Sequence, residues 1–118
     1  MRVRIEALAE ATYVVPEGRL DFDAAGGFQE ALEKAVAGAG KASATLIVDG
    51  AALEYVSSAG LRAVLLGAKA AQRAGVPFAL CALQPAVREV FELSGFSRIM
   101  AVHLDRETAL AQARRGRT

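Results

Sequence analysis

The chain has no tryptophan, one cysteine and one histidine among its 118 residues. The lone Cys81 excludes an internal disulfide and any metal site built from several cysteines. No Ser-His-Asp arrangement can be argued for the lone His103, which lies in the last apolar run. Aromatic residues make up only 6% of the chain, which weakens an interpretation as a base-stacking nucleic-acid binder. We therefore expect no metal ion and no cofactor.

Long apolar runs are also missing. No run approaches the roughly 20 residues needed to span a bilayer. The first residues lack the apolar stretch of a signal peptide and include the acidic Glu6. The formal net charge of +1 favours neither nucleic acid nor an anionic membrane as a partner. We therefore expect a cytoplasmic protein with no nucleic-acid partner and no membrane insertion, and a monomer as the default state when free.

Hydrophobic residues make up 53% of the chain, too many for a disordered protein. At this length about two-thirds of the unfolded surface can be buried, which is enough for one core. The sequence therefore predicts a single domain over residues 1–113, followed by a short basic tail over residues 114–118.

Apolar patterning predicts strands alternating with helices. The predicted strands lie at 2–8, 11–15, 44–49, 77–83 and 99–104. The predicted helices run from 22 or 24 to 37 and over 58–74, 85–94 and 106–113. The order ββαβαβαβα indicates an α/β fold with a mixed, mostly parallel sheet and an N-terminal antiparallel hairpin.

Local signals mark the ends of these elements. The segment 16–18, Pro-Glu-Gly, is expected to end the second strand, and 38–40, Gly-Ala-Gly, to end the first helix. Asp21 or Asp23 is the expected cap of the first helix, and Asp105 that of the last. Apolar residues expected to pack are Phe28, Leu32, Ala35 and Val36 in the first helix and Val87, Val90, Phe91 and Leu93 in the third.

The stretch from Leu46 to Arg62 is the centre of the chain. A buried strand ends at Asp49, whose carboxylate we expect to bind loop amides, and a loop then leads to Ser57 and Ser58. Helical spacing begins at Gly60. A helix start carries unpaired N–H groups and partial positive charge, so a serine there is either a cap or a favourable place for a phosphate.

Three segments resemble one known family. They are Gly18-Arg19-Leu20-Asp21, Tyr55-Val56-Ser57-Ser58-Ala59-Gly60-Leu61, and the stretch from Ala82 to Phe96 that contains Leu93-Ser94-Gly95. With these segments the chain resembles the STAS-domain family, specifically its small single-domain anti-sigma-factor antagonists. The resemblance spans nearly the whole chain and implies a STAS fold.

The resemblance also implies a function without catalysis. Family antagonists bind a serine kinase that is itself an anti-sigma factor and has an ATP-binding histidine-kinase-like fold. The complex sequesters that kinase and frees the sigma factor. Phosphorylation of an antagonist serine dissociates the complex, and a PP2C-type phosphatase resets it. The resemblance thus predicts a phosphorylation-switched regulator of transcription.

The common family pattern is Asp-Ser-Ser/Thr-Gly-Leu, with the first serine phosphorylated. Aligning it on the Gly-Leu pair predicts Ser58 as the phosphoacceptor, with Ser57, at the aspartate position, as the lesser candidate. The partner-binding residues that the resemblance suggests are Asp21, Ser57, Ala59, Gly60, Leu61 and Arg62.

Other interpretations of the same residues stay open. Ser58 is equally placed to be a plain N-cap. The domain is also compatible with a STAS subunit of a lipid-transport ATPase complex or a secretion regulator, without a serine switch. A small hydrolase using Asp49 or Glu54 is the remote alternative. Cys81 is expected to be inert packing, and His103 to lie in the core or at an edge.

Overall fold

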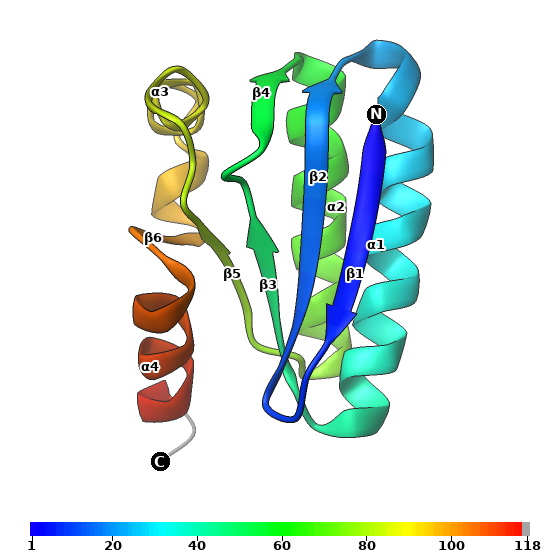
Figure 1. Ribbon diagram of the computed structural model, residues 1–118, viewed down its shortest axis with the longest axis vertical. Coiled ribbons are helices and arrows are strands. Elements are labelled where there is room, and N and C mark those ends of the chain that lie inside the picture. Colours follow the sequence, from blue (N-terminus) through cyan, green and yellow to red (C-terminus); the bar gives the residue numbers. More distant parts are fainter. Residues whose placement is uncertain (117–118) are drawn as a thin grey trace.

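The computed structural model describes residues 1–116, with side chains as far as Ala113. Within them lie six strands, four α-helices and one 3-10 turn, η1 (Phe96–Arg98) (Figure 1). The strands are β1 (Arg2–Ala7), β2 (Ala11–Leu20), β3 (Thr45–Asp49), β4 (Leu53–Val56), β5 (Phe78–Cys81) and β6 (Ala101–His103). The helices are α1 (Phe22–Ala42), α2 (Ser58–Ala74), α3 (Pro85–Leu93) and α4 (Arg106–Gly116).

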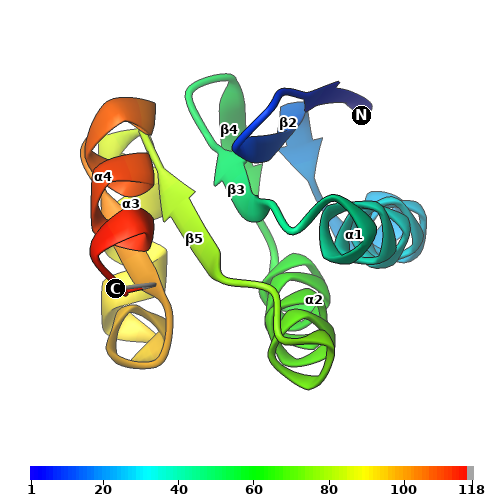
Figure 2. The ribbon, with the colours of Figure 1, turned by 90° about the horizontal axis from the view of Figure 1, so that it is seen from below.

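The strands form one mixed sheet in the order β1-β2-β3-β5-β6, and β4 also pairs with β2. β1 is antiparallel to β2, and all other strand pairs are parallel. The predicted α/β fold and N-terminal hairpin are therefore confirmed. Figure 2 shows α1 and α2 side by side on one side of the sheet, with α3 and α4 beyond β5.

The sheet separates two apolar clusters, because successive strand residues point to opposite faces. Val14, Leu46 and Val48 belong to the larger cluster with α1 and α2, and it includes Phe28 and Leu32 as predicted. Tyr13 and Ile47, one residue along each strand, belong to the smaller cluster that also contains Ala109 of α4. Buried strands β3 and β5 thus connect both layers.

The expected end of β2 is wrong, since the strand continues past the Pro-Glu-Gly segment to Leu20. Pairing with β3 ends at Val14, and pairing with β4 starts at Gly18. Pro16 falls between these ladders, where its missing N–H costs little. Gly18, at φ 96, lies where the register with β4 shifts. The sequence showed the special residues but not the change of partner.

The short strand β4 is absent from the predicted order and occupies part of the expected loop. Leu53 and Val56 are buried at its ends, whereas Glu54 and Tyr55 between them are exposed. This pattern matches neither strict alternation nor a continuous apolar run. Its pairing with the end of β2, which the sequence does not reveal, makes it a strand.

The expected end of α1 is also wrong. The helix passes through Gly38 and Gly40 and ends at Ser43, which adopts left-handed φ 54. Ala39 is completely buried, and Gly40 lies against Val76. Packing of this last turn outweighs a cost of about 1 kcal/mol per helical glycine.

The third helix packs through Val87 and Phe91 as predicted, but Leu93 is 81% exposed, so its predicted packing role is wrong. Leu93 lies about 200° around the helix from Phe91, on the opposite face. After Gly95, at φ 81, the chain forms η1 rather than extending. The predicted strand 99–104 therefore shrinks to β6.

The last helix begins after Asp105 as predicted, and the Asp105 carboxylate accepts a hydrogen bond of 2.8 Å from the Thr108 N–H. It continues past Ala113 to Gly116, into the segment expected to be a tail. Residues 117–118 lie outside the described part of the chain. None of the helices between residues 1 and 116 is long and apolar enough to cross a membrane.

Candidate functional site

Ser57 and Ser58, here called the serine loop, join β4 to α2 at the edge of the sheet where β2 and β4 end (Figure 1). The half-buried Ser57 is the N-cap of α2, and its hydroxyl accepts a hydrogen bond of 3.1 Å from the Gly60 N–H. The same hydroxyl donates to the Leu20 carbonyl at 3.1 Å, which also accepts the Ser57 N–H at 2.9 Å. Ser57 therefore fastens the start of α2 to the end of β2.

Ser58 is the first residue of α2 and is exposed. Its hydroxyl has no hydrogen-bond partner among the described residues, because Ser57 already occupies the capping position. The interpretation of Ser58 as a plain N-cap is therefore wrong. A free, exposed hydroxyl at a helix start, where the helix dipole favours negative charge, suits a phosphoacceptor.

Two predicted contact residues beside Ser58 are buried. Gly60 has no room for a side chain, because an added Cβ would lie 2.6 Å from the Leu20 carbonyl oxygen. Leu61 is 9% exposed and belongs to the larger apolar cluster. Both residues therefore pack against the rest of the domain and position the loop. The exposed Arg62 and half-buried Ala59 remain accessible beside Ser58.

Asp21 caps α1 in the way that Ser57 caps α2. Its carboxylate accepts a hydrogen bond of 3.0 Å from the Ala24 N–H, which decides between the two expected caps, Asp21 and Asp23. The bonds from Ser57 to Leu20 place this cap next to the serine loop. Two helix starts with their partial positive charges therefore meet at one edge of the molecule.

Sequence reasoning missed an aromatic element of this edge. Phe22, the first residue of α1, is 80% exposed, and Tyr55 on β4 is 40% exposed. The Arg19 guanidinium lies 4.1 Å from the centre of the Tyr55 ring, a cation–π contact. Phe22 directly follows the capping Asp21, and an apolar side chain is not needed at that position of a helix. This unusual residue was the signal in the sequence that could have revealed the exposed aromatic side chain.

Comparison with known proteins decides the family. The family model for the STAS domain matches residues 2–109. The chain belongs to the STAS-domain family. This match covers every described strand and reaches into α4.

Relatives of this STAS domain include proteins named as anti-sigma factor antagonists. BtrV of Bordetella bronchiseptica, so named, is 48% identical over 71 residues, covering 60% of this chain and 61% of BtrV. The STAS domain thus spans less than two thirds of this curated relative. The structure of RsbS S58E from Moorella thermoacetica is 30% identical, covers 100% of both chains and has a TM-score of 0.79.

The fold is also that of SpoIIAA, described as an anti-sigma factor antagonist. Its unphosphorylated form covers 96% of each chain at 23% identity, with a TM-score of 0.76. Its phosphorylated form, from Bacillus, covers 95% of this STAS domain and 99% of that chain at 21% identity, with a TM-score of 0.68. At these identities the likeness establishes the fold.

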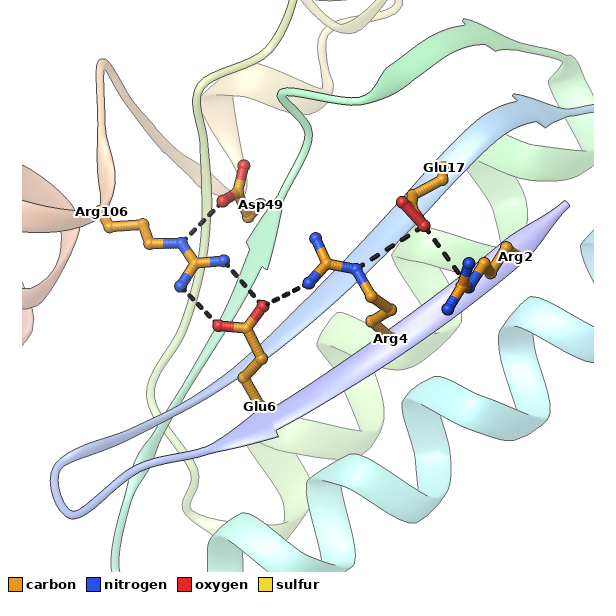
Figure 3. A network of polar contacts seen from close by, with 6 residues as sticks. All are labelled: Arg2, Arg4, Glu6, Glu17, Asp49 and Arg106. Atoms are coloured by element: carbon orange, nitrogen blue, oxygen red, sulfur yellow. Dashed lines mark hydrogen bonds and ion pairs between the residues drawn. The ribbon is translucent and has the colours of Figure 1, made fainter.

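The acidic residues considered for catalysis have different surroundings. Asp49 accepts a hydrogen bond of 3.0 Å from the Ala51 N–H, which confirms the expected binding of a loop amide. It also accepts one of 2.7 Å from Arg106 Nε, and Figure 3 shows Arg106 between Asp49 and Glu6. Glu54 is exposed on β4. The Asp49 carboxylate therefore holds the β3–β4 loop and α4 together.

The remaining candidates have structural positions. Cys81 is buried in β5, and burial raises the pKa of its thiol to about 12, so it is packed and unreactive as expected. His103 is half-buried on β6, at the edge of the sheet, which agrees with the expected edge position.

Replacing Ser57 by alanine should lower the free energy of unfolding by about 1 kcal/mol, because the cap and the bond to Leu20 are both lost. Chemical denaturation measures this change. Ser58→Ala is the matched control and should change stability by less than about 0.5 kcal/mol, since its hydroxyl is free. Equal effects of the two substitutions would contradict the assignment of Ser57 as the cap.

Replacing Arg106 by glutamine should cost about 1–2 kcal/mol at neutral pH, chiefly because the Asp49 carboxylate loses its charged partner. Arg106 also lies 4.1 Å over the Tyr13 ring. The hydrogen bond from Arg106 lowers the pKa of Glu6. The stabilisation from the Arg106–Glu6 pair is therefore present at neutral pH and is lost as the pH falls through the lowered pKa of Glu6. Between neutral pH and about pH 3, the free energy of unfolding should accordingly fall less in the Arg106→Gln variant than in the native protein.

Urea unfolding at both pH values measures the effect. Arg88→Gln is the control, because it removes an exposed i,i+4 pair with Glu92 on α3. That pair contributes about 0.3–0.5 kcal/mol. An Arg106 effect no larger than the Arg88 effect would contradict the role of Arg106 in holding α4.

Proposed function

We propose that the protein is an anti-sigma-factor antagonist whose binding is switched off by phosphorylation of Ser58. The observation that carries this proposal is the different hydrogen bonding of the two serine hydroxyls. Ser57 caps α2 and holds Leu20, while Ser58 presents a free, exposed hydroxyl at the helix start. The named functions of BtrV and SpoIIAA, and the existence of a phosphorylated SpoIIAA, support it.

The proposed partner is a serine kinase and anti-sigma factor with an ATP-binding histidine-kinase-like fold, reset by a PP2C-type phosphatase. The kinase binds the edge formed by Asp21, Phe22, Ala59 and Arg62 around Ser58. Ser57, at the usual aspartate position, serves as the cap, a role that aspartate fills equally well. The change from the common family pattern therefore leaves the cap in place.

The switch needs no refolding. A phosphate adds a charge of about −1.5 to −2 at physiological pH. On Ser58 this charge lies at the start of α2, where the dipole stabilises it. On the facing kinase surface it introduces steric conflict, desolvation and repulsion from acidic groups or a nucleotide phosphate. Phosphorylation thus changes the surface and keeps the fold.

The test is phosphosite mapping by mass spectrometry after incubation with the genomically adjacent candidate kinase and ATP. One phosphate on Ser58, absent from Ser58→Ala and retained in Ser57→Ala, is expected. A phosphate on Ser57 would overturn the site assignment. Binding without transfer would indicate a constitutive antagonist, and recovery of membrane ATPase subunits instead of a kinase would favour a subunit of a larger assembly.

Phe22 is expected to anchor the partner, because its aromatic side chain is 80% exposed at the start of α1 and is available for burial. Phe22→Ala should weaken kinase binding by about tenfold or more, measured by calorimetry, with little change in stability. Leu93→Ala is the control, since Leu93 is equally exposed at the end of α3. Similar losses from both variants would contradict a specific role for Phe22.

A further inference from the structure

Strand β1 is an edge of the sheet with one side of its backbone unpaired among the described residues (Figure 1). Residues of an antiparallel pair exchange both backbone bonds at every second position. The Leu8 N–H donates to the Ala11 carbonyl at 2.9 Å, so the backbone N–H and C=O groups of the even-numbered residues in β1 point toward β2. Val3, opposite the donor-less Pro16, follows the same alternation. The N–H and C=O groups of Val3, Ile5 and Ala7 therefore point outward.

The surface beside this edge is apolar. Ile5 is 47% exposed and Leu8 58% exposed. Both line a groove of about 460 Å³ between β1 and α1, whose helical wall includes the small residues Gly27, Ala31 and Gly38. An unpaired strand edge next to an apolar groove is a surface suited to strand addition.

The charges of β1 are complementary to themselves. If two copies of β1 pair antiparallel about an axis at Ile5, then Ile5 meets its own copy and Val3 meets Ala7. The same register places Arg4 opposite Glu6 twice, on the face shown in Figure 3. An axis at Arg4 would also make two opposite-charge pairs, Arg2 with Glu6 of the other copy, but it would place the two Arg4 side chains opposite each other. The register centred on Ile5 has no like-charge pair and is therefore favoured.

Helix α1 repeats this complementarity. Glu30 and Lys34 both line the groove. Gly27 and Ala31 line this groove and also the neighbouring one that contains Val3, so α1 passes Ile5 near residue 31. A two-fold axis through Ile5 therefore runs an antiparallel copy of α1 past the first, with Glu30 near Lys34 of the other copy. Small residues on this helix face allow the close approach.

We propose that the protein forms a two-fold symmetric homodimer through β1, which extends the sheet across both copies, with α1 packed beside its symmetry mate. The outward groups of Val3, Ile5 and Ala7 supply the backbone bonds, and the two charge pairs set the register. The dimer replaces the monomer expected by default from the sequence. It leaves the serine loop, on the other side of β2, accessible.

Sedimentation equilibrium over a dilution series should show a monomer–dimer equilibrium. Ile5→Pro removes one outward N–H and no bond to β2, so the variant should fold but dissociate. Ile5→Ala keeps the N–H and should retain more dimer than Ile5→Pro. Circular dichroism checks that both variants are folded.

A charge exchange on α1 tests the axis without altering β1. Glu30→Lys should raise the dimer dissociation constant about tenfold, because symmetry places each new lysine near Lys34 of the other copy. Glu30→Lys combined with Lys34→Glu should restore dimerisation. Glu33→Lys, on the same helix but outside the groove, should have little effect. A native protein that is monomeric at every concentration, or a dimer insensitive to Ile5→Pro and Glu30→Lys, would overturn the proposal.

Discussion

Phosphorylation of Ser58 is expected to weaken binding of the proposed kinase partner by about 100-fold or more, a loss of a few kcal/mol. The cause is a dianion within the proposed contact edge, which also presents the exposed side chains of Phe22 and Arg62. The stability of the folded state should not fall, because the phosphate lies at a helix start and the capping hydrogen bond from the Gly60 N–H to Ser57 is unchanged. Calorimetric titration of the two forms measures the affinity.

Two substitutions separate charge from shape at this position. Ser58→Ala should bind as tightly as the native protein and accept no phosphate. Ser58→Asp should weaken binding in the same direction as phosphorylation, with a smaller effect because it carries less charge. If Ser58→Asp and Ser58→Ala bind equally tightly, while both remain folded, the electrostatic explanation of the switch is wrong.

Replacing Gly60 by alanine is expected to lower the free energy of unfolding by about 2–3 kcal/mol. A Cβ at this position would lie 2.6 Å from the Leu20 carbonyl oxygen and 2.7 Å from Leu20 Cγ. The backbone oxygen can give way only if α2 moves from β2, which also stretches the bonds between Ser57 and Leu20. Chemical denaturation measures the loss, and partner binding should weaken with it.

Gly26→Ala is the matched control with the opposite sign. Gly26 lies in α1 with nothing within 4 Å of an added Cβ. Alanine there should stabilise the protein by about 0.5–1 kcal/mol through its higher helix propensity. Equal changes at the two positions would show that helix propensity, and not the close approach to β2, determines the role of Gly60.

Local patterns predicted most of the fold, and the resemblance to the STAS-domain family predicted where the candidate site lies. Apolar spacing located α2, whose bounds of Ser58–Ala74 and left-handed Gly75 agree with the prediction. The antiparallel hairpin also followed from alternation. These elements are determined by short-range periodicity and by end signals that act within a few residues. Aligning the family pattern on the Gly-Leu pair then gave the two candidate serines.

Only the tertiary structure could assign different roles to Ser57 and Ser58. Both serines lie at the start of a helix, and which one caps it depends on where the chain turns at Leu20, 37 residues before Ser57. The local spacing of residues does not show which distant segment of the chain will pack against them.

The sequence by itself determined the element order of an α/β domain apart from β4, and the buried stripes of α1 and α2, and it indicated the stretch that contains the candidate site. Tertiary structure decided where β2 and α1 end, that β4 is a strand, and that Gly60 and Leu61 are buried. Strand pairing and helix packing extend over many residues and together outweigh the local cost of Pro16 or Gly38. Local chemistry therefore placed the elements, and packing decided their ends and which hydroxyl remained free.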